Sequence, residues 1–352
     1  MQSEGRSGEL RWRLAEPGEA GRLLPQSSLG ERHVGTGEFQ GMEFLPVAAR
    51  TIINKVPASS RMPFRYTINA YRGCSHACTY CFARPTHRYL GLGIGEDFER
   101  KIVVKVNAVE RLRAELRSPR WRGDSIAMGT NTDPYQTAEG KYHLTQGIVG
   151  VLAEAGNPFS ILTKSTLVLR DLALLVDAAA RTRLRLALSI GTLARDVWQL
   201  TEPGAAPPDK RLEAVRRLSE AGIRCGVLIA PVLPGLSDSD DQLRTVARAC
   251  LEAGAVSVTP VALHLRPGVR EHYLDWLARA RPELAELYAQ RFRKGSYQPR
   301  AEQHRISEVV RAVQEAGGRG YPKRRRRGHE PTGHPREALA RRRPVNEQLR
   351  LL

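Results

Sequence analysis

No apolar run in the 352-residue sequence approaches the ~18 residues that a helix needs to cross a membrane. The first 21 residues, MQSEGRSGELRWRLAEPGEAG, also lack the apolar core of a secretory signal peptide. Hydrophobic residues make up 41% of the chain, which is ordinary for a globular protein. From these observations we expect a cytoplasmic protein that is monomeric and has no membrane partner.

Cysteine is scarce: the chain has five, and three of them, Cys74, Cys78 and Cys81, fall within eight positions. In a reducing compartment such a group indicates a metal site rather than disulfides. The second CxxC pair that usually accompanies structural zinc is missing, although His76 or His87 could complete a Cys₃His site. A [4Fe–4S] cluster normally takes four thiolates, so three would leave one iron open to a substrate or cofactor. Both metals remain candidates.

Acidic residues are outnumbered, with 37 Asp and Glu against 55 Lys and Arg, and the formal net charge is +18. Residues 319–352 hold eleven Lys and Arg but three Asp and Glu. This tail is poor in aromatic residues, so we expect it to be disordered. A basic chain with a basic tail favours a polyanionic partner, and nucleic acid is the usual one. The alternative is a solvated appendage that reflects genome composition.

Strand-like and helix-like segments alternate along the chain. We expect strands at 64–71, 125–130, 159–163, 185–190, 225–232 and 256–264, and helices at 107–118, 144–156, 169–182, 209–222, 240–254 and 269–280. Six such βα units predict a parallel sheet, because each crossover helix returns the chain to the same end. The sheet is either open and doubly wound or an incomplete barrel. In both cases ligands collect beyond the carboxyl ends of the strands.

Local signals mark several helix ends. Asn107 and Glu110 are typical of an N-cap and its partner three residues later. Gly156, Gly222 and Gly254 are typical of the residue that follows a helix. One or two further helices are predicted after residue 281.

Polar and reactive residues gather where the predicted strands end. The cysteine loop follows the first strand, TNTDPYQ (130–136) follows the second and TKS (163–165) follows the third. Lys164 comes directly after an apolar strand, and Asn131 and Asp133 follow IAMGT. Loops after strands are polar in general, but these side chains exceed what a turn requires. We therefore predict a site at this edge of the sheet.

The motif Cys74-x₃-Cys78-x₂-Cys81, with Tyr80 before the last cysteine, resembles the signature of the radical S-adenosylmethionine (radical SAM) superfamily. In that family the motif follows the first strand of a partial (β/α)₆ TIM-like barrel. Over roughly residues 45–300, the segments INAYRGCSHACTYCFARPTH, TNTDPYQ, TKSTLVLRD and APVLPGLSD resemble the SplB-like subgroup, which is related to spore photoproduct lyase and is also described as DNA-repair-photolyase-like.

The resemblance implies an enzyme that holds a [4Fe–4S] cluster and cleaves S-adenosylmethionine (SAM) reductively to methionine and a 5′-deoxyadenosyl radical. An electron donor such as flavodoxin or ferredoxin would reduce the cluster. The residues implied are Cys74, Cys78 and Cys81 as cluster ligands, Tyr80 at the adenine, Thr130, Asn131 and Asp133 at the amino group, Lys164 at the carboxylate and Ser189 at the ribose. The Gly-Gly-Glu-like motif that usually binds the amino group is missing.

One departure bears on the substrate. Spore photoproduct lyase has a hydrogen-donor cysteine just after the second strand, whereas this chain reads AMGTNTD there. We therefore do not expect thymine-dimer lyase activity. Cys225 and Cys250 are expected to be buried hydrophobic residues.

Three hypotheses follow. The first is a radical SAM enzyme of unknown substrate, such as a nucleic acid or another macromolecule. The second is a zinc-stabilised nucleic-acid-binding protein without catalysis, and the third is a radical SAM enzyme acting on a small molecule or peptide. The expected organisation is a poorly ordered extension at 1–44, a core at 45–290, a helical segment at 291–318 and the basic tail at 319–352.

Overall fold

A sheet of seven strands dominates the computed structural model, which describes residues 33–60 and 62–317. Its strands, in spatial order, are β11 (Val258–Ala262), β10 (Cys225–Val232), β9 (Leu184–Ser189), β8 (Phe159–Thr163), β7 (Ile126–Met128), β4 (Tyr66–Ile68) and β3 (Ile53–Lys55). The six strands from β11 to β4 are parallel, and β3 runs antiparallel to β4. The predicted α/β fold with a parallel sheet is therefore confirmed.

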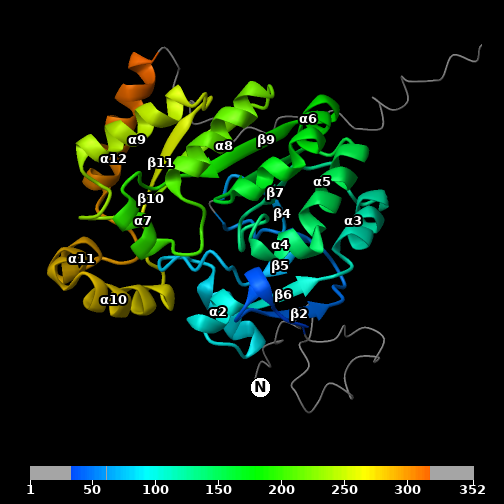
Figure 1. Cartoon of the computed structure of the whole chain (residues 1–352), viewed down its shortest axis with the longest axis horizontal. Coiled ribbons are helices and arrows are strands. Elements are labelled where there is room, and N and C mark those ends of the chain that lie inside the picture. Colours follow the sequence, from blue (N-terminus) through cyan, green and yellow to red (C-terminus); the bar gives the residue numbers. More distant parts are fainter. Residues whose placement is uncertain (1–32, 61, 318–352) are drawn as a thin grey trace, which may run out of the picture.

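A helix follows each parallel strand, as the alternation predicted. These helices are α3 (Ala108–Arg117), α5 (Leu144–Glu154), α6 (Leu172–Arg181), α8 (Pro208–Glu220), α9 (Asp240–Glu252) and α10 (Val269–Ala280). Shorter elements lie in the connections: η3 (Arg84–Leu90), α2 (Glu96–Arg100), α4 (Thr137–Tyr142), η4 (Thr166–Asp171) and α7 (Arg195–Thr201). In Figure 1, α8, α6, α5 and α3 follow one another along one side of the sheet.

The C-terminal part of the described chain covers one edge of the sheet. It contains η5 (Pro282–Leu284), α11 (Ala285–Arg291) and α12 (Arg300–Ala316). α12 packs against α9 and β11 (Figure 1), and its Gln314 Oε1 accepts a hydrogen bond of 2.7 Å from the backbone N–H of Val258. A side chain thus satisfies a backbone donor of the edge strand β11. The predicted basic tail at 319–352 lies outside the described residues.

A second, smaller sheet was not predicted from the sequence. Its strands are β1 (His33–Val34), β2 (Glu43–Val47), β6 (Lys101–Lys105) and β5 (Tyr71–Arg72), in that spatial order. The segment 64–71, predicted as one strand, divides between the two sheets: β4 joins the large sheet, and β5 pairs antiparallel with β6. The chain changes sheets at Asn69 and Ala70, where the Ala70 carbonyl accepts from the Lys105 N–H at 3.0 Å.

Residues 33–44 lie in the segment expected to be a poorly ordered extension. In the structure they contribute β1, a short turn η2 (Gly37–Phe39) and the first residues of β2. Phe44 of β2 is fully buried and packs edge-on against the Phe39 ring, with 5.6 Å between ring centroids. This apolar contact joins the segment to the core. Residues 1–32 lie outside the described residues.

The side-chain contact predicted for the N-cap of the first helix is wrong. Asn107 does occupy the N-cap position of α3, but its side chain does not cap the helix. Its Oδ1 accepts from the Ala49 N–H at 2.8 Å, and its Nδ2 donates to the Ala49 carbonyl at 3.0 Å. The Asn107 side chain therefore bonds a backbone segment distant in sequence instead of capping its own helix.

The predicted helix-ending glycines are confirmed. Gly156, Gly222 and Gly254 have φ values of +61°, +79° and +93°, in the left-handed region that favours glycine. Across the described residues, no helix is both long enough and apolar enough to cross a membrane.

Gly129 directly follows β7 and precedes the predicted site. Its backbone geometry allows a test of the fold. Its φ is +85°, and an added Cβ would lie 2.0 Å from the Leu162 carbonyl oxygen of β8. Gly129→Ala should therefore lower the free energy of unfolding by more than about 2 kcal/mol, measured by urea denaturation. As a control, Gly150→Ala within α5 meets no atom within 4 Å and should stabilise the protein by about 0.5–1 kcal/mol. Equal urea midpoints for the two variants would contradict this account of the strand end.

Candidate functional site

The three clustered cysteines share one loop that follows β4 and β5. All are free thiols; Cys74 and Cys78 are buried and Cys81 is half-buried. Burial, and then the neighbouring Asp133, raise the pKa of the Cys74 thiol, while burial and then Glu202 raise the pKa of Cys78 to about 12. Negative charge on Cys78 or Cys81 would raise the pKa of Cys74 further, so the thiols are electrostatic neighbours. Together they would ionise only with a compensating cation.

This donor set fits an iron–sulfur cluster by its chemistry. Thiolates are the ordinary ligands of such clusters, and a cluster distributes its protein ligands over several irons. Within the residues that the structure describes, no group of three or more His, Cys, Asp or Glu side chains is arranged to hold a single metal ion. The three thiols are therefore grouped in one loop without forming a compact single-ion site.

Arg84 fixes the backbone of the cysteine loop, and sequence reasoning missed it. Its side chain is fully buried, with Nε donating to the Cys78 carbonyl at 2.9 Å and Nη2 donating to the Ala77 carbonyl at 3.1 Å. The Arg84 guanidinium forms an ion pair with Glu99, with 2.5 Å between Arg84 Nη2 and Glu99 Oε1. Because carbonyls 77 and 78 both point at one guanidinium, the loop between Cys74 and Cys81 has a defined shape. No spacing rule marks this arginine in the sequence.

The loop after β7 is hydrogen-bonded to the cysteine loop. Thr132 Oγ1 donates to the Gly73 carbonyl at 2.6 Å, and Gln136 Nε2 donates to the same carbonyl at 3.0 Å. Gln136 Oε1 in turn accepts from the Ser75 N–H at 3.0 Å. The first two predicted strand-end loops therefore form one connected structure.

Lys164 brings three of the predicted residues together. Its Nζ donates to Ser189 Oγ at 2.6 Å and to the Ala230 carbonyl at 3.2 Å. The same ammonium lies 5.9 Å from the centre of the Tyr80 ring. Tyr80, Lys164 and Ser189 come from three separate strand-end loops, so the common edge of the parallel sheet assembles them.

Glu202, the residue after α7, is the buried anion at this place. Its carboxylate lies 3.6 Å from Lys164 Nζ and 2.5 Å from Arg211 Nη2, and it accepts a hydrogen bond from the Tyr80 hydroxyl. Burial alone would raise its pKa, but Arg211 and then Lys164 lower the pKa to about 2. Arg211 also donates to the Ser189 carbonyl at 2.9 Å. The pairing of Glu202 with Arg211 was not predicted from the sequence, because Glu202 lies in a stretch to which no helix or strand had been assigned.

Asp133, which the resemblance implies at the SAM amino group, is hydrogen-bonded within the protein. Its carboxylate accepts from Thr163 Oγ1 at 2.6 Å, from the Lys164 N–H at 2.8 Å and from the Tyr135 N–H at 2.9 Å. His76 Nδ1 lies 3.4 Å from the same carboxylate. A carboxylate offers roughly four acceptor positions. Most of those of Asp133 are therefore occupied by contacts that join the loops after β7 and β8.

The two histidines considered for zinc have other contacts. His76 faces Asp133, and His87 Nε2 lies 3.1 Å from the Lys101 carbonyl. Burial lowers the pKa of both imidazoles. These contacts place neither ring in a Cys₃His arrangement.

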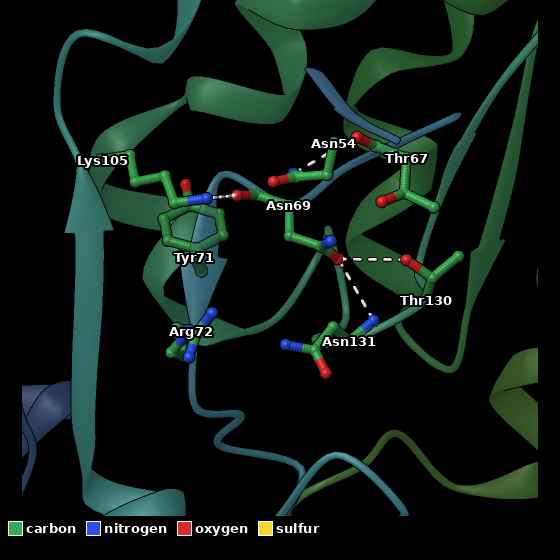
Figure 2. Close-up of a pocket in the computed structure, with 8 residues that line it drawn as sticks. All are labelled: Asn54, Thr67, Asn69, Tyr71, Arg72, Lys105, Thr130 and Asn131. Carbon is green, nitrogen blue, oxygen red and sulfur yellow. Dashed lines mark hydrogen bonds between the residues drawn. The ribbon is translucent and has the colours of Figure 1, made fainter. Parts of the chain in front are cut away.

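Thr130 and Asn131 lie on the wall of a cavity of about 200 Å³ between the two sheets. Figure 2 shows Asn69 at the middle of this wall. Its Oδ1 accepts from Thr130 Oγ1 at 3.4 Å and from the Asn131 N–H at 3.1 Å, and its backbone oxygen accepts from Lys105 Nζ at 2.7 Å. The predicted residues therefore divide into two groups, one at the cavity and one around Glu202.

Removing the Glu202 charge should destabilise the protein, because the buried Arg211 and the half-buried Lys164 would remain without the carboxylate that they contact. Glu202→Gln should lower the free energy of unfolding by about 3–5 kcal/mol at neutral pH, measured by urea denaturation. A carboxyl whose pKa is lowered on folding stabilises the folded state above its unfolded value of 4.5, and that stability is lost as pH falls towards 2. The difference from the wild type should therefore shrink over that interval.

The matched control is Glu213→Gln, an exposed glutamate paired with Arg216. It should change the free energy of unfolding by no more than about 0.5 kcal/mol. A Glu202→Gln protein as stable as this control would show that the buried carboxylate does not hold the site together.

Comparison with known proteins gives the family. The sequence profile of the Radical SAM superfamily matches residues 68–247, which include the cysteine loop and the Lys164 and Glu202 positions. An uncharacterized protein of Mycobacterium tuberculosis, Rv2578c, is 46% identical over 279 residues, which cover 79% of this chain and 82% of that protein. A protein of Pseudomonas phage M6 named radical SAM Nalpha-GlyT isomerase is 27% identical over 170 residues, or 48% of this chain and 33% of that protein.

The fold is similar to that of spore photoproduct lyase. The structure of that lyase complexed with dinucleoside spore photoproduct aligns with a TM-score of 0.58 at 19% sequence identity, covering 78% of this chain and 79% of the lyase chain. At this identity the likeness concerns the fold alone. The sequence profile extends the argument from fold to family, and the chain belongs to the radical SAM superfamily.

Proposed function

We propose that the protein is an enzyme that holds a [4Fe–4S] cluster through Cys74, Cys78 and Cys81 and uses it to cleave SAM reductively. When bound, the cluster supplies the electron that converts SAM to methionine and a 5′-deoxyadenosyl radical, which abstracts hydrogen from a substrate. The observation that carries the proposal is the grouping of three thiols, two buried and one half-buried, in one loop beside Lys164, within a radical SAM chain.

The roles of the surrounding residues follow from their contacts. Lys164 offers an ammonium at the edge of the sheet and is our proposed partner for the SAM carboxylate. Ser189, which already bonds Lys164, is proposed to contact the ribose, and the backbone at Tyr80 to face the adenine. Thr130 and Asn131 are proposed near the SAM amino group, in preference to Asp133, because the Asp133 carboxylate already accepts three hydrogen bonds.

Partners and substrate class are also proposals. A flavodoxin or ferredoxin would supply the electron. A nucleic acid or another macromolecule is the proposed substrate, supported by the net charge of +18 and by a fold shared with a lyase complexed with dinucleoside spore photoproduct. We do not propose thymine-dimer lyase activity, since residues 126–133 contain no cysteine. Random DNA or RNA that binds in a salt-sensitive way would favour this class over a small-molecule or peptide substrate.

The zinc-binding alternative has less support. It requires a fourth ligand from His76 or His87, and the structure gives those rings contacts with Asp133 and with the Lys101 carbonyl. Absorption near 400 nm by protein purified without oxygen distinguishes the two metals, because zinc is silent there.

The cluster ligands can be tested one by one. Replacement of Cys74, Cys78 or Cys81 by Ala should in each case abolish iron and sulfide binding, because the remaining thiolates cannot hold the cluster. Cys225→Ala and Cys250→Ala are matched controls; both residues are fully buried in the hydrophobic core and should leave the iron content unchanged. A Cys78→Ala protein with full iron and sulfide would refute the assignment.

Turnover tests the enzyme itself. Reduced, cluster-loaded protein should form 5′-deoxyadenosine and methionine from SAM, measured by liquid chromatography with dithionite as reductant. Lys164→Ala should keep its iron but bind SAM about tenfold or more weakly, because a charge-assisted hydrogen bond is lost. Lys210→Ala, an exposed lysine on α8, is the control and should bind SAM normally. If protein with a full cluster forms no 5′-deoxyadenosine with any reductant or candidate substrate, the proposed enzymatic activity is excluded.

A further inference from the structure

Three aromatic rings lie next to one another at the carboxyl edge of the large sheet. The His264 ring, in the loop after β11, lies 5.7 Å from the Tyr297 ring at an interplanar angle of 23° and 6.0 Å from the Phe82 ring at 32°, measured between ring centroids. Phe82 directly follows Cys81 in the cysteine loop, and Tyr297 precedes α12. We call Phe82, His264 and Tyr297 the aromatic row. It joins three segments that are distant in sequence.

Backbone hydrogen bonds fix the row in place. His264 and Tyr297 face each other in an antiparallel backbone bridge. Beside it, the Leu265 N–H donates to the Ser296 carbonyl at 2.8 Å. The segment before α12 is therefore paired with the loop after β11, and two of the three rings are carried by paired backbone.

The row is continuous with the candidate functional site. Leu263 and Leu265, on either side of His264 in the sequence, are buried in the same hydrophobic cluster as Cys78 and Tyr80 of the cysteine loop. The loop after β11 therefore packs against the cysteine loop through its leucines and carries the His264 ring between them. A ligand on the row would lie at the same edge of the sheet as the thiols.

The outer rings of the row are open to solvent. The Phe82 side chain is 44% exposed and that of Tyr297 is 58% exposed. Burial, and then the charge of Arg266, lower the pKa of His264, so the central ring is uncharged at neutral pH. Exposed aromatic rings on a fixed backbone are typical of a contact surface. Nucleobases suit such a surface, because every base has a π-face that stacks on aromatic rings.

Cations surround the row. The exposed ones nearest to it in the structure or the sequence are Arg88, Arg266, Arg293 and Lys294. A Cβ placed on Gly268 would lie 3.7 Å from Arg88 Nη1, so that guanidinium lies beside the loop after β11. The carboxylate of Glu271 near the same loop accepts from the Gly268 N–H at 2.6 Å, at the start of α10. Aromatic rings combined with cations are the means by which proteins bind single-stranded nucleic acid.

We propose that bases of a single-stranded nucleic acid stack on the aromatic row while Arg88 and Arg266 contact its phosphates. This inference rests on the proposed function, because it places a substrate strand at the edge of the sheet where SAM would be cleaved. In a duplex the bases stack on one another, so they are not available to the rings. The row therefore selects single strands and holds a base next to the cysteine loop.

Binding of a labelled oligonucleotide to the full-length, cluster-loaded protein tests the row without turnover. Fluorescence anisotropy would use a single strand of about twelve nucleotides, a length within the range of known single-strand sites. Tyr297→Ala should weaken binding about tenfold, because one stacking ring is lost. Tyr297→Phe keeps the ring and should bind as the wild type does. Tyr89→Ala is the matched control, since Tyr89 is 67% exposed but lies outside the row.

An abasic strand of the same length separates stacking from charge. Residues 319–352 hold eleven Lys and Arg, so charge alone gives affinity for any strand. The wild type should bind the abasic strand about tenfold or more weakly than the normal one, and Tyr297→Ala should not weaken the abasic complex further. Arg266→Ala should weaken both complexes and reduce the slope of log affinity against log salt by about 0.7, as expected for one phosphate contact.

Two results would overturn the proposal directly. One is equal affinity of the wild type for the normal and the abasic strand. The other is binding of the normal strand by both Tyr297→Ala and His264→Ala with the affinity of the wild type. If those variants bind the strand normally but their clusters are reduced more slowly by flavodoxin, the surface serves the electron donor and the proposal is wrong.

SAM binding and turnover separate this inference from the proposed function. If Tyr297→Ala loses affinity for labelled SAM in equilibrium dialysis to the same extent as for the strand, the row belongs to the cofactor site and the proposal is wrong. Ring-dependent strand binding by a protein that forms no 5′-deoxyadenosine would refute the proposed function and leave the row supported as a base-binding surface. Formation of 5′-deoxyadenosine without ring-dependent strand binding would refute the row alone.

Discussion

The Glu202 carboxylate accepts a charge-assisted hydrogen bond of 2.5 Å from Arg211 and lies 3.6 Å from the Lys164 ammonium, where water is excluded. Each of these charges alone would cost several kcal/mol to bury, and the combination is tolerable because the three are held at short distances with further hydrogen bonds. The Tyr80 hydroxyl gives one of those bonds and thereby ties the cysteine loop to the same carboxylate. The position of Lys164 beside the cysteines thus depends on Glu202.

The same charges bear on the chemistry of the thiols. Burial raises the pKa of Cys78, and the negative charge of Glu202 raises it further, whereas Lys164 and Arg211 lower it. Metal ligation requires thiolates, so a bound cluster would bring negative ligands into a place where two fixed cations already act on them. Burial raises the pKa of Cys81, and the charge of Arg84 acts in the opposite direction while its hydrogen bonds hold the loop backbone. Loop shape and thiolate stabilisation therefore come from one set of buried arginine and lysine side chains.

The parts of this molecule that sequence reasoning could predict are those with a local signal. Six βα units were visible because apolar runs alternate with amphipathic helices, and the cysteine loop because its residues are adjacent. The small sheet was missed because β1 and β5 are two residues each, too short for any periodicity. Partners that are close in space but distant in sequence were missed for a related reason: Asn107 bonds Ala49, 58 positions away, and no local pattern records that choice. The roles of Glu202 and Arg84 likewise depend on neighbours that only the fold brings near.

The charges of Lys164 and Arg211 are met within the protein. Around Lys164 and Arg211 the protein supplies its own anion, Glu202, at 3.6 and 2.5 Å, so that group can remain charged whether or not a ligand is bound. These charges are therefore a fixed electrostatic frame for the thiols.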